Sequence, residues 1–380
     1  MGGSLPAVDS LPEDAVLLHI GVHKTGTTAL QAALADARED LAAAGVRYPG
    51  KLQAQHRAAL AVLGRPWGWN NRGGAVLDRA HFDRLSARVA EHPGRVVISS
   101  EFFCEAPEDV AREVVSGLGG QRVHVVVTLR NLGKLLPSSW QQYLKYGLTT
   151  DYETWLEDVF ATPGSSRMSP TFWKRQAHGA VVERWAAAVG PDRLTVVVLE
   201  DVDRSAMFTT FAQMLGVNPQ ILVSRMDLTS NRSMTAAEAE LLVRLNAQVK
   251  KQMDWTEYVT VVRRGVAKGM VEGREPLPEE ARVATPGWAL DAAANEGRTA
   301  AAHIAASGVR VVGDLDALTV RLPDETGVTP TDIPIDAAVA ALTAMVEAVH
   351  EQPTSRQLAG RLWREVRRHG WRSLLREKSE

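Results

Sequence analysis

A lysine inside a glycine-bounded loop is the first group in the chain with the make-up of an anion site. Residues 14–20, DAVLLHI, form an apolar run, and residues 27–45 carry apolar side chains at helical spacing. Between them, Gly21 and Gly26 bound a G-x-x-x-x-G frame that contains Lys24. Glycines permit a tight turn lined by backbone amides, and the N-terminus of the following helix favours an anion. The pattern therefore predicts a phosphate-binding loop between a strand and a helix.

The position of the lysine distinguishes this loop from that of nucleotide hydrolases and kinases. In those loops the lysine follows the second glycine, whereas here Thr27 holds that place and Lys24 lies within the loop. The sequence also shows no compelling strand that ends in an aspartate suited to magnesium, so the usual arrangement of metal and phosphate in ATP chemistry is not encoded. The alternatives are a chance glycine- and threonine-rich turn and, for His23, a structural role. The residues that we expect to bind one phosphate-bearing end of a ligand are His23, Lys24, Thr25, Gly26, Thr27 and Thr28.

A second basic group follows the most β-branched run in the chain. Residues 122–129, RVHVVVTL, end directly before Arg130, and Ser138 follows eight residues after this arginine. Ligands of open α/β sheets collect at the carboxyl ends of strands. A helix from about residue 133 would turn Ser138 back toward Arg130, so that a guanidinium fork and a hydroxyl could meet one phosphate. The alternative is an arginine at the sheet edge with a solvent-facing serine, but beside the first loop the pair predicts a ligand with two phosphate-bearing ends.

Strands that alternate with helices must position these two groups. Further strands are expected at 46–49, 95–99 and 193–199. Helices are expected at about 78–91, 107–117, 133–146, 151–160, 171–189 and 203–215. This alternation predicts a parallel sheet covered on both faces. We therefore expect an α/β, P-loop-like, three-layer fold with a central parallel sheet flanked by helices.

The pattern changes beyond about residue 220, where helices dominate. We expect residues 1–220 to form an α/β core that carries both anion-binding groups and residues 221–380 to form a mainly helical C-terminal extension. One weak strand candidate, 309–315, interrupts the helices expected at 234–251, 287–307, 335–350 and 355–377. The segment 355–378 is basic and amphipathic. It either packs its apolar stripe on its own domain or makes peripheral contact with an anionic membrane.

The composition narrows the class of protein. The chain has 380 residues, of which 45% are hydrophobic and 23% charged, as in globular proteins with a large core. A formal net charge of −2 offers no global basic field for nucleic acid. The single cysteine, Cys104, excludes a disulfide framework and a cysteine-rich metal site. Because we find neither a leader nor a membrane-spanning window, we expect a cytoplasmic enzyme. Nothing in the composition predicts its oligomeric state.

Together the two motifs resemble those of sulfotransferases that use 3′-phosphoadenosine 5′-phosphosulfate. HKTGTTAL, residues 23–30, resembles the 5′-phosphosulfate loop, and LRNLGKLLPSS, residues 129–139, resembles the 3′-phosphate motif. KTGTTAL is closer to the carbohydrate-modifying, Golgi-type members than to the cytosolic phenol and steroid type. The latter carry an adenine-stacking tryptophan where this chain has Ala29. LLHIGVHKTGTT with VVISSEFF is similar to bacterial members, and the resemblance covers about residues 14–215.

The resemblance implies transfer of a sulfuryl group to a hydroxyl of a carbohydrate, glycolipid or small metabolite, with adenosine 3′,5′-bisphosphate as the product and no metal. The hydroxyl would attack sulfur in line, while Lys24 and the loop amides neutralise the charge on the bridging oxygen. Arg130 and Ser138 would hold the 3′-phosphate. The resemblance makes residues 1–220 the nucleotide-binding core and residues 221–380 the acceptor or lid region. The segments NRSMT, 231–235, and VVRRG, 261–265, are candidates for closing over the nucleotide, with Arg263 or Arg264 as a further ligand of the 3′-phosphate.

Two residues are candidates for the general base that takes the proton of the acceptor. Glu101 directly follows the strand VVISS, and we expect Phe102 and Phe103 to desolvate it and raise its pKa. His56 lies near the place where carbohydrate-type enzymes carry acceptor-contacting residues. The alternatives are an ion-paired carboxylate and a surface histidine, and the two groups could also act together.

Two other classes of function remain open at this stage. One is a phosphotransferase with an atypical P-loop that uses ATP and magnesium, and the other is a non-catalytic nucleotide-binding protein. Trp67, in a glycine-rich loop, either stacks on an acceptor or holds the loop against the core.

Overall fold

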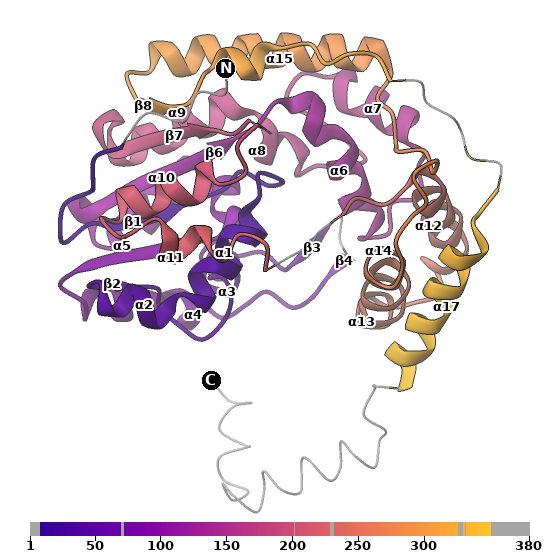
Figure 1. Ribbon diagram of the computed structural model, residues 1–380, viewed down its shortest axis with the longest axis horizontal. Coiled ribbons are helices and arrows are strands. Elements are labelled where there is room, and N and C mark those ends of the chain that lie inside the picture. The colour runs from indigo at the N-terminus through magenta and orange to yellow at the C-terminus, as the bar shows by residue number, and fades with distance from the viewer. Residues whose placement is uncertain are drawn as a thin grey trace, which may run out of the picture.

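A six-stranded parallel sheet forms the centre of the computed structural model, which describes residues 8–69, 72–200, 202–228, 232–325, 330 and 332–350. The strand order is β2-β5-β1-β6-β7-β8 (Figure 1). The strands are β1 (Val16–His19), β2 (Val46–Arg47), β5 (Arg95–Ser99), β6 (Val123–Leu129), β7 (Leu194–Val198) and β8 (Arg310–Val312). β1 lies between β5 and β6 and runs parallel to both. The segments that follow these three strands therefore meet at one edge of the sheet.

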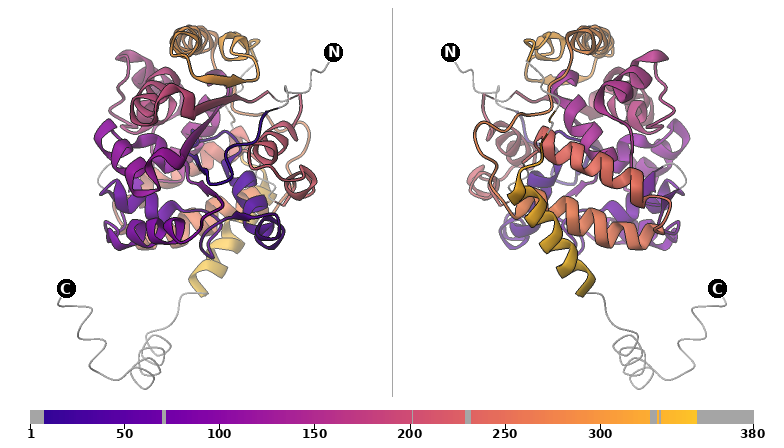
Figure 2. Two further views of the ribbon diagram at one scale, coloured as in Figure 1. Left: turned by 90° about the vertical axis from the view of Figure 1, so that its left-hand side faces the viewer. Right: turned by 90° about the vertical axis from the view of Figure 1, so that its right-hand side faces the viewer.

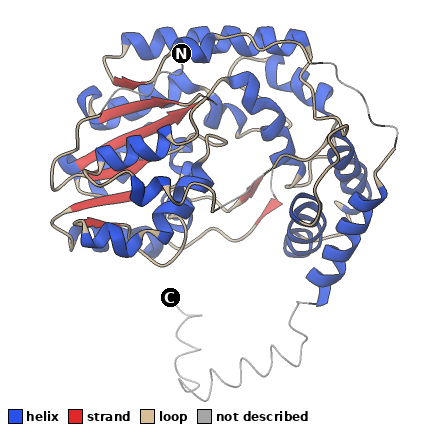
Figure 3. Cartoon of the chain, in the orientation of Figure 1, coloured by secondary structure: helices blue, strands red, loops and turns tan. Residues whose placement is uncertain are grey.

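Helices cover both faces of the sheet because its strands are apolar on both sides. Val16 and Leu18 belong to one hydrophobic cluster, and Leu17, between them, belongs to another. The first cluster includes residues of α3 (His56–Val62), α4 (Ala80–Ala90), α5 (Glu108–Gly117) and α9 (His178–Val189). The second includes residues of α1 (Thr27–Asp36), α2 (Arg38–Ala43), α10 (Ala206–Met214) and α11 (Gln220–Val223). The predicted α/β fold with a central parallel sheet is confirmed (Figure 3).

The outer strand of the sheet comes from the C-terminal part of the chain. β8 pairs with β7 in parallel register, with Val311 beside Val196. It confirms the strand predicted at 309–315, although it is shorter. α15 (Gly287–Ala306) precedes β8 and contacts α9, and α16 (Asp316–Thr319) follows. The division at residue 220 stays a prediction, with one strand of the sheet contributed from beyond it.

A third hydrophobic core, separate from the two clusters that cover the sheet, surrounds the helix that follows β6. This helix, α6 (Leu132–Leu144), begins within one residue of the predicted start. Its neighbours in this core are α7 (Tyr152–Ala161), α8 (Phe172–Gln176), α12 (Ala236–Val249), α13 (Trp255–Tyr258), the π-helix η4 (Val259–Ala267), α14 (Lys268–Glu272) and α17 (Ile335–His350). In the right-hand view of Figure 2, α12, α13, α14 and α17 lie together on the side that faces the viewer, whereas α15 lies at the top. No helix in the described part of the chain is long and apolar enough to cross a membrane.

Short elements complete the described chain. They are the 3₁₀ helices η1 (Glu101–Glu105), η2 (Gly120–Arg122) and η3 (Pro191–Arg193), and an antiparallel pair of β3 (Gly68–Trp69) and β4 (Arg72–Gly73). The segment 355–378, for which we predicted a basic amphipathic helix, lies outside the described residues.

Candidate active site

The loop between β1 and α1 adopts a left-handed backbone at three positions. Gly21, Lys24 and Gly26 have φ angles of 88°, 70° and 76°. A Cβ on Gly21 would lie 2.8 Å from the Cβ of Glu101, so a larger residue would clash where the loop passes the end of β5. α1 begins at Thr27, directly after Gly26, and leaves its first backbone N–H groups free for an anion. The sequence therefore predicted the strand, loop and helix correctly.

Buried polar side chains anchor this loop to the sheet. The hydroxyl of Thr25 donates to the carbonyl of Val22 at 2.7 Å and lies 2.7 Å from the Thr128 hydroxyl on β6. The His19 ring bonds Thr128 at 3.1 Å and Ser99, on β5, at 2.8 Å. Three adjacent strands thus share one network beneath the loop. The Thr25 side chain is buried in that network, so any part it takes in binding a ligand falls to its backbone.

Lys24 reaches from the loop to α6. Its Nζ donates to the Oε1 of Gln142 at 3.0 Å. Burial lowers the pKa of Lys24 to about 7, and the charges of Lys145, Arg175 and Arg263 add to the shift, while Glu101 opposes it. The strained φ of Lys24, unusual for a residue with a side chain, aims the amine toward this helix. The amine is therefore hydrogen-bonded to a neutral amide, while the charge of Glu101 favours its protonated form.

His23 is turned away from this amine. Its Nε2 lies 3.3 Å from Glu105, and its ring packs edge-on against Phe102 at 5.3 Å between centroids. Burial lowers its pKa to about 4. Glu105 is itself buried and pairs with Arg175 at 2.9 Å and Arg65 at 2.6 Å. These contacts favour the structural alternative for the His23 ring.

Glu101 and His56, the two candidate bases, lie side by side. The Nε2 of His56 is 3.8 Å from the Oε2 of Glu101, and its Nδ1 lies 2.8 Å from the Ser100 hydroxyl. Gln31, on α1, donates to the same Glu101 oxygen at 3.0 Å. His56 begins α3 and Glu101 begins η1, so two elements on the β5 side of the loop bring the pair together.

The prediction that the pKa of Glu101 is raised is wrong. Burial alone would raise it, but the charges of His56 and His23 and the hydrogen bond from Gln31 lower it to about 2. The two phenylalanines next to Glu101 are buried as expected. The sequence patterns did not predict that Gln31 from α1 and His56 from α3 would lie next to the Glu101 carboxylate.

Arg130 and Ser138 line one cavity of about 770 Å³ on the β6 side of the loop. The Ser138 hydroxyl donates to the carbonyl of Leu135 at 3.0 Å, so it has to turn from this carbonyl in order to donate to a phosphate. Asn131 caps α6 and donates to the carbonyls of Ala317 and Val320. This cap fixes the cavity wall to the segment after α16.

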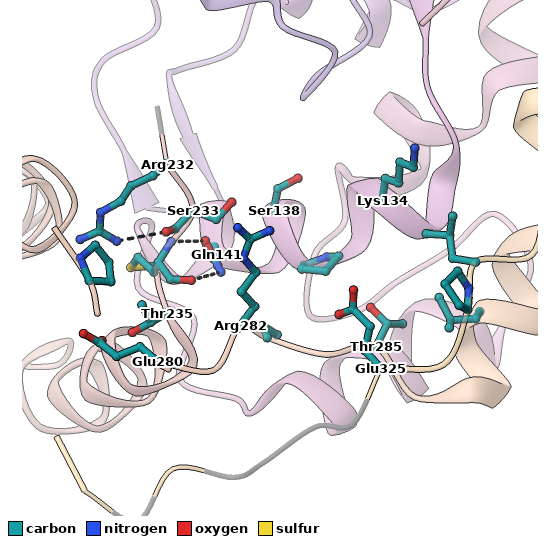
Figure 4. Close-up of a pocket in the computed structure, with 18 of the residues that line it drawn as sticks. Lys134, Ser138, Gln141, Arg232, Ser233, Thr235, Glu280, Arg282, Thr285 and Glu325 are labelled. Atoms are coloured by element: carbon teal, nitrogen blue, oxygen red, sulfur yellow. Dashed lines mark hydrogen bonds between the residues drawn. The ribbon is translucent and has the colours of Figure 1, made fainter. Parts of the chain in front are cut away.

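Two further arginines, from the C-terminal part of the chain, line the same cavity. Arg232 makes two hydrogen bonds to the buried carboxylate of Glu238, at 2.7 and 2.8 Å. Figure 4 shows Arg282 extending toward the helix that carries Ser138 and Gln141. Gln141 bonds both the N–H and the carbonyl of Met234, which joins this segment to α6. The 231–235 segment was predicted to close over the nucleotide, but Arg282 was not predicted, because an isolated arginine in a proline-rich connection carries no spacing signal.

The loop and the cavity are neighbours. Thr128, bonded to Thr25 in the loop, lies two residues before Arg130. Gln142, which holds Lys24, lies one helical turn after Ser138, and at 1.5 Å per residue the rise between them is about 6 Å. The predicted anion groups are thus at adjacent positions on one sheet edge and one face of α6.

Arg263 does not line this cavity. It lies in η4, with its guanidinium carbon 4.0 Å from the centroid of the Trp67 ring and 5.0 Å from that of Tyr146. The structure thus separates it from Arg130 and Ser138, and the assignment of Arg263 to the 3′-phosphate is corrected on that ground. Trp67 is partly buried and packs against the third core, around α6. The face of its ring lies against the guanidinium of Arg263.

Comparisons with known proteins add little beyond these contacts. No family model matches the chain, and no curated protein matches it. One solved structure, a sulfotransferase from Alicyclobacillus acidocaldarius, aligns with 64% of this chain and 97% of its own at 14% sequence identity and a TM-score of 0.41. At that level of similarity, the conclusions below rest on the geometry of this chain.

Proposed function

We propose that this protein is a sulfotransferase that moves a sulfuryl group from 3′-phosphoadenosine 5′-phosphosulfate to a hydroxyl of a carbohydrate, glycolipid or small metabolite. The observation that carries the proposal is the adjacency of two anion-binding groups. Lys24 contacts α6 one turn from Ser138, and Ser138 shares a cavity with Arg130. One nucleotide with phosphates at its 3′ and 5′ positions fits such an arrangement.

The residues of the loop have complementary tasks in this proposal. The free N–H groups at the start of α1 and the amine of Lys24 bind the 5′-phosphosulfate. When the bond between sulfur and the bridging oxygen breaks, the electron pair stays on that oxygen. Lys24 stabilises the charge that develops there. Arg130 and Ser138 hold the 3′-phosphate and so fix the distance between the donor and the acceptor.

The paired side chains beyond β5 supply the general base. An ionised carboxylate with a pKa of about 2 is a poor proton acceptor and a good partner for a cation. We therefore assign proton acceptance to the Nε2 of His56, with Glu101 stabilising the imidazolium that forms at 3.8 Å. The acceptor oxygen forms its bond to sulfur as its proton passes to His56. Gln31 keeps Glu101 in place through the bond at 3.0 Å.

Titration with nucleotides tests this proposal directly. Adenosine 3′,5′-bisphosphate is expected to raise the midpoint of thermal unfolding because it binds the folded state and not the unfolded state. ATP with magnesium is expected to act far more weakly, since it lacks a 3′-phosphate for Arg130. Stabilisation by ATP and magnesium alone would exclude the sulfotransferase and favour a phosphotransferase.

Nucleotide affinity is expected to fall as the pH rises above 7. With a pKa of about 7 in the free protein, Lys24 loses its proton above this pH. The negative charge of a bound nucleotide raises that pKa, so binding takes up a proton, and the affinity falls by at most tenfold per pH unit. Isothermal titration of adenosine 3′,5′-bisphosphate between pH 7.5 and 9, in buffers with different ionisation enthalpies, measures the uptake.

The same titration of a Lys24→Met variant is the control. This variant is expected to take up no proton in that range. Proton uptake that persists in the variant would assign the titration to another group and contradict the proposed contact between Lys24 and the nucleotide.

A further inference from the structure

Two cations adjoin the candidate active site on the side away from Arg130. Lys145 caps the C-terminus of α6, and Arg263, in η4, is near enough for its charge to lower the pKa of Lys145. The link between them is Tyr146, which follows Lys145 in the chain and whose ring centroid lies 5.0 Å from the Arg263 guanidinium carbon. Throughout the described ranges, no carboxylate lies within ion-pair distance of either cation.

Lys145 continues the face of α6 that carries the site. Ser138, Gln142 and Lys145 are spaced by four and three residues, which places them on one face of the helix. The rise from the first to the last is about 10 Å. Ser138 marks the proposed 3′-phosphate, and Gln142 marks the amine of Lys24. Lys145 therefore marks the next position along this face, where an acceptor would approach.

The contacts of Arg263 leave its hydrogen-bond donors available. The guanidinium carbon lies over the ring of Trp67 at 4.0 Å and over that of Tyr146 at 5.0 Å, and these two rings stand at 85° to each other. Arginine has five N–H donors, and in Arg263 none of them is hydrogen-bonded to another residue in the described part of the chain. The two rings also restrict the movement of the guanidinium before a ligand arrives.

Burial and mutual repulsion make the charged forms of Lys145 and Arg263 less favourable, and a bound anion would offset both effects. Burial lowers the pKa of Lys145, and the charge of Arg263 lowers it further. Burial likewise lowers the pKa of Arg263. Glu272 and Glu238 act on Lys145 only from beyond ion-pair distance. The neighbouring Arg175 differs, because buried Glu105 neutralises it at 2.9 Å.

We propose that Lys145 and Arg263 bind an anionic group of the acceptor, a carboxylate, sulfate or phosphate, and so make this protein selective for acidic acceptors. The inference rests on the proposed function, because it takes the position beyond Lys24 to be the acceptor side. A neutral acceptor would leave both cations desolvated and unpaired. An acidic one supplies a partner for both, and the bond to it sets the distance from its hydroxyl to sulfur.

Titration with sodium sulfate at constant ionic strength tests this anion site. Wild-type protein saturated with adenosine 3′,5′-bisphosphate is expected to bind one sulfate ion, measured by isothermal titration calorimetry. Lys145→Met and Arg263→Met are each expected to weaken this binding at least tenfold. Dimethyl sulfone, which is tetrahedral and uncharged, is expected not to bind. The matched controls, Arg264→Met and Lys174→Met, remove exposed cations from neighbouring surfaces and are expected to bind sulfate as wild type does.

A Lys24→Met variant separates this site from the sulfuryl position in the loop. Sulfate binding that survives Lys24→Met and is lost in Lys145→Met supports the proposal. Loss in Lys24→Met alone, or no sulfate binding by the folded wild type, overturns it. If Arg263→Met fails to fold, Arg263→Lys keeps a charge there and is expected to bind sulfate more weakly than wild type, and equal binding overturns the role of the fork.

The proposed function can fail separately from this inference. If the wild type does not bind adenosine 3′,5′-bisphosphate, the sulfotransferase proposal is lost. The sulfate titration of the nucleotide-free protein, with the same variants, then still decides whether Lys145 and Arg263 bind an anion.

Discussion

Replacing Lys24 by methionine is expected to lower kcat on the order of 10²- to 10³-fold. The amine extends from the loop before α1 to Gln142 on α6, and in this proposal it meets the bridging oxygen as that atom gains charge. Removal of one preorganised donor of this kind is worth about 3–4 kcal/mol. Methionine keeps most of the length of the side chain and removes its charge. The effect is measured as the rate at which the donor loses its ³⁵S label in a single turnover. This rate includes both transfer to an acceptor hydroxyl and slow hydrolysis by water.

The affinity for adenosine 3′,5′-bisphosphate is the internal control for this variant. It is expected to change far less than kcat, since Arg130 and Ser138 still hold the 3′-phosphate. Lys174→Met, at an exposed position on α8, is expected to match wild type in both measurements. A Lys24→Met variant with unchanged kcat would reject the assigned role, and if its affinity fell at the same time, Lys24 would be a binding residue only.

Replacing Arg130 by methionine is expected to weaken the binding of adenosine 3′,5′-bisphosphate about 100-fold. A charge-assisted hydrogen bond contributes about 1.5–3 kcal/mol, and a guanidinium can make two to one phosphate. Adenosine 5′-phosphosulfate, which lacks the 3′-phosphate, is expected to bind wild type and variant alike. Isothermal titration of both ligands to both proteins measures the difference.

Ser138→Ala provides the graded comparison for this variant. It removes one neutral donor from the same cavity and is expected to cost roughly tenfold in affinity for the bisphosphate only. A loss of equal size for both ligands in Arg130→Met would show that the arginine shapes the cavity and does not bind the 3′-phosphate.

The positions of Lys24, Arg130 and Glu101 were predictable because each follows a strand whose pattern is visible in the sequence. Parallel strands align their carboxyl ends, so residues far apart in the chain meet at one edge as soon as β5, β1 and β6 are neighbours. The helix position of Ser138 followed from its spacing in the same way. His56 was found through the resemblance, and the structure places it beside Glu101.

The local charge balance was not predictable from the same patterns. The lowered pKa of Glu101 depends on His56 from α3 and Gln31 from α1. The aromatic stacking of Arg263 depends on Trp67, which is almost two hundred residues earlier in the chain. Such contacts join elements whose relative placement no short motif encodes.

The sequence by itself determined the sheet, the loop and the residues at the ends of its strands, because hydrophobic periodicity and glycine spacing act within a few residues. Only the tertiary structure decided which side chains are left for a ligand. Thr25 and His23 are bound to buried partners, while Lys24, Lys145 and Arg263 are brought close without a carboxylate partner in the described part of the chain. Electrostatic interactions extend across elements through space, so their balance depends on how the helices pack and not on their order in the chain.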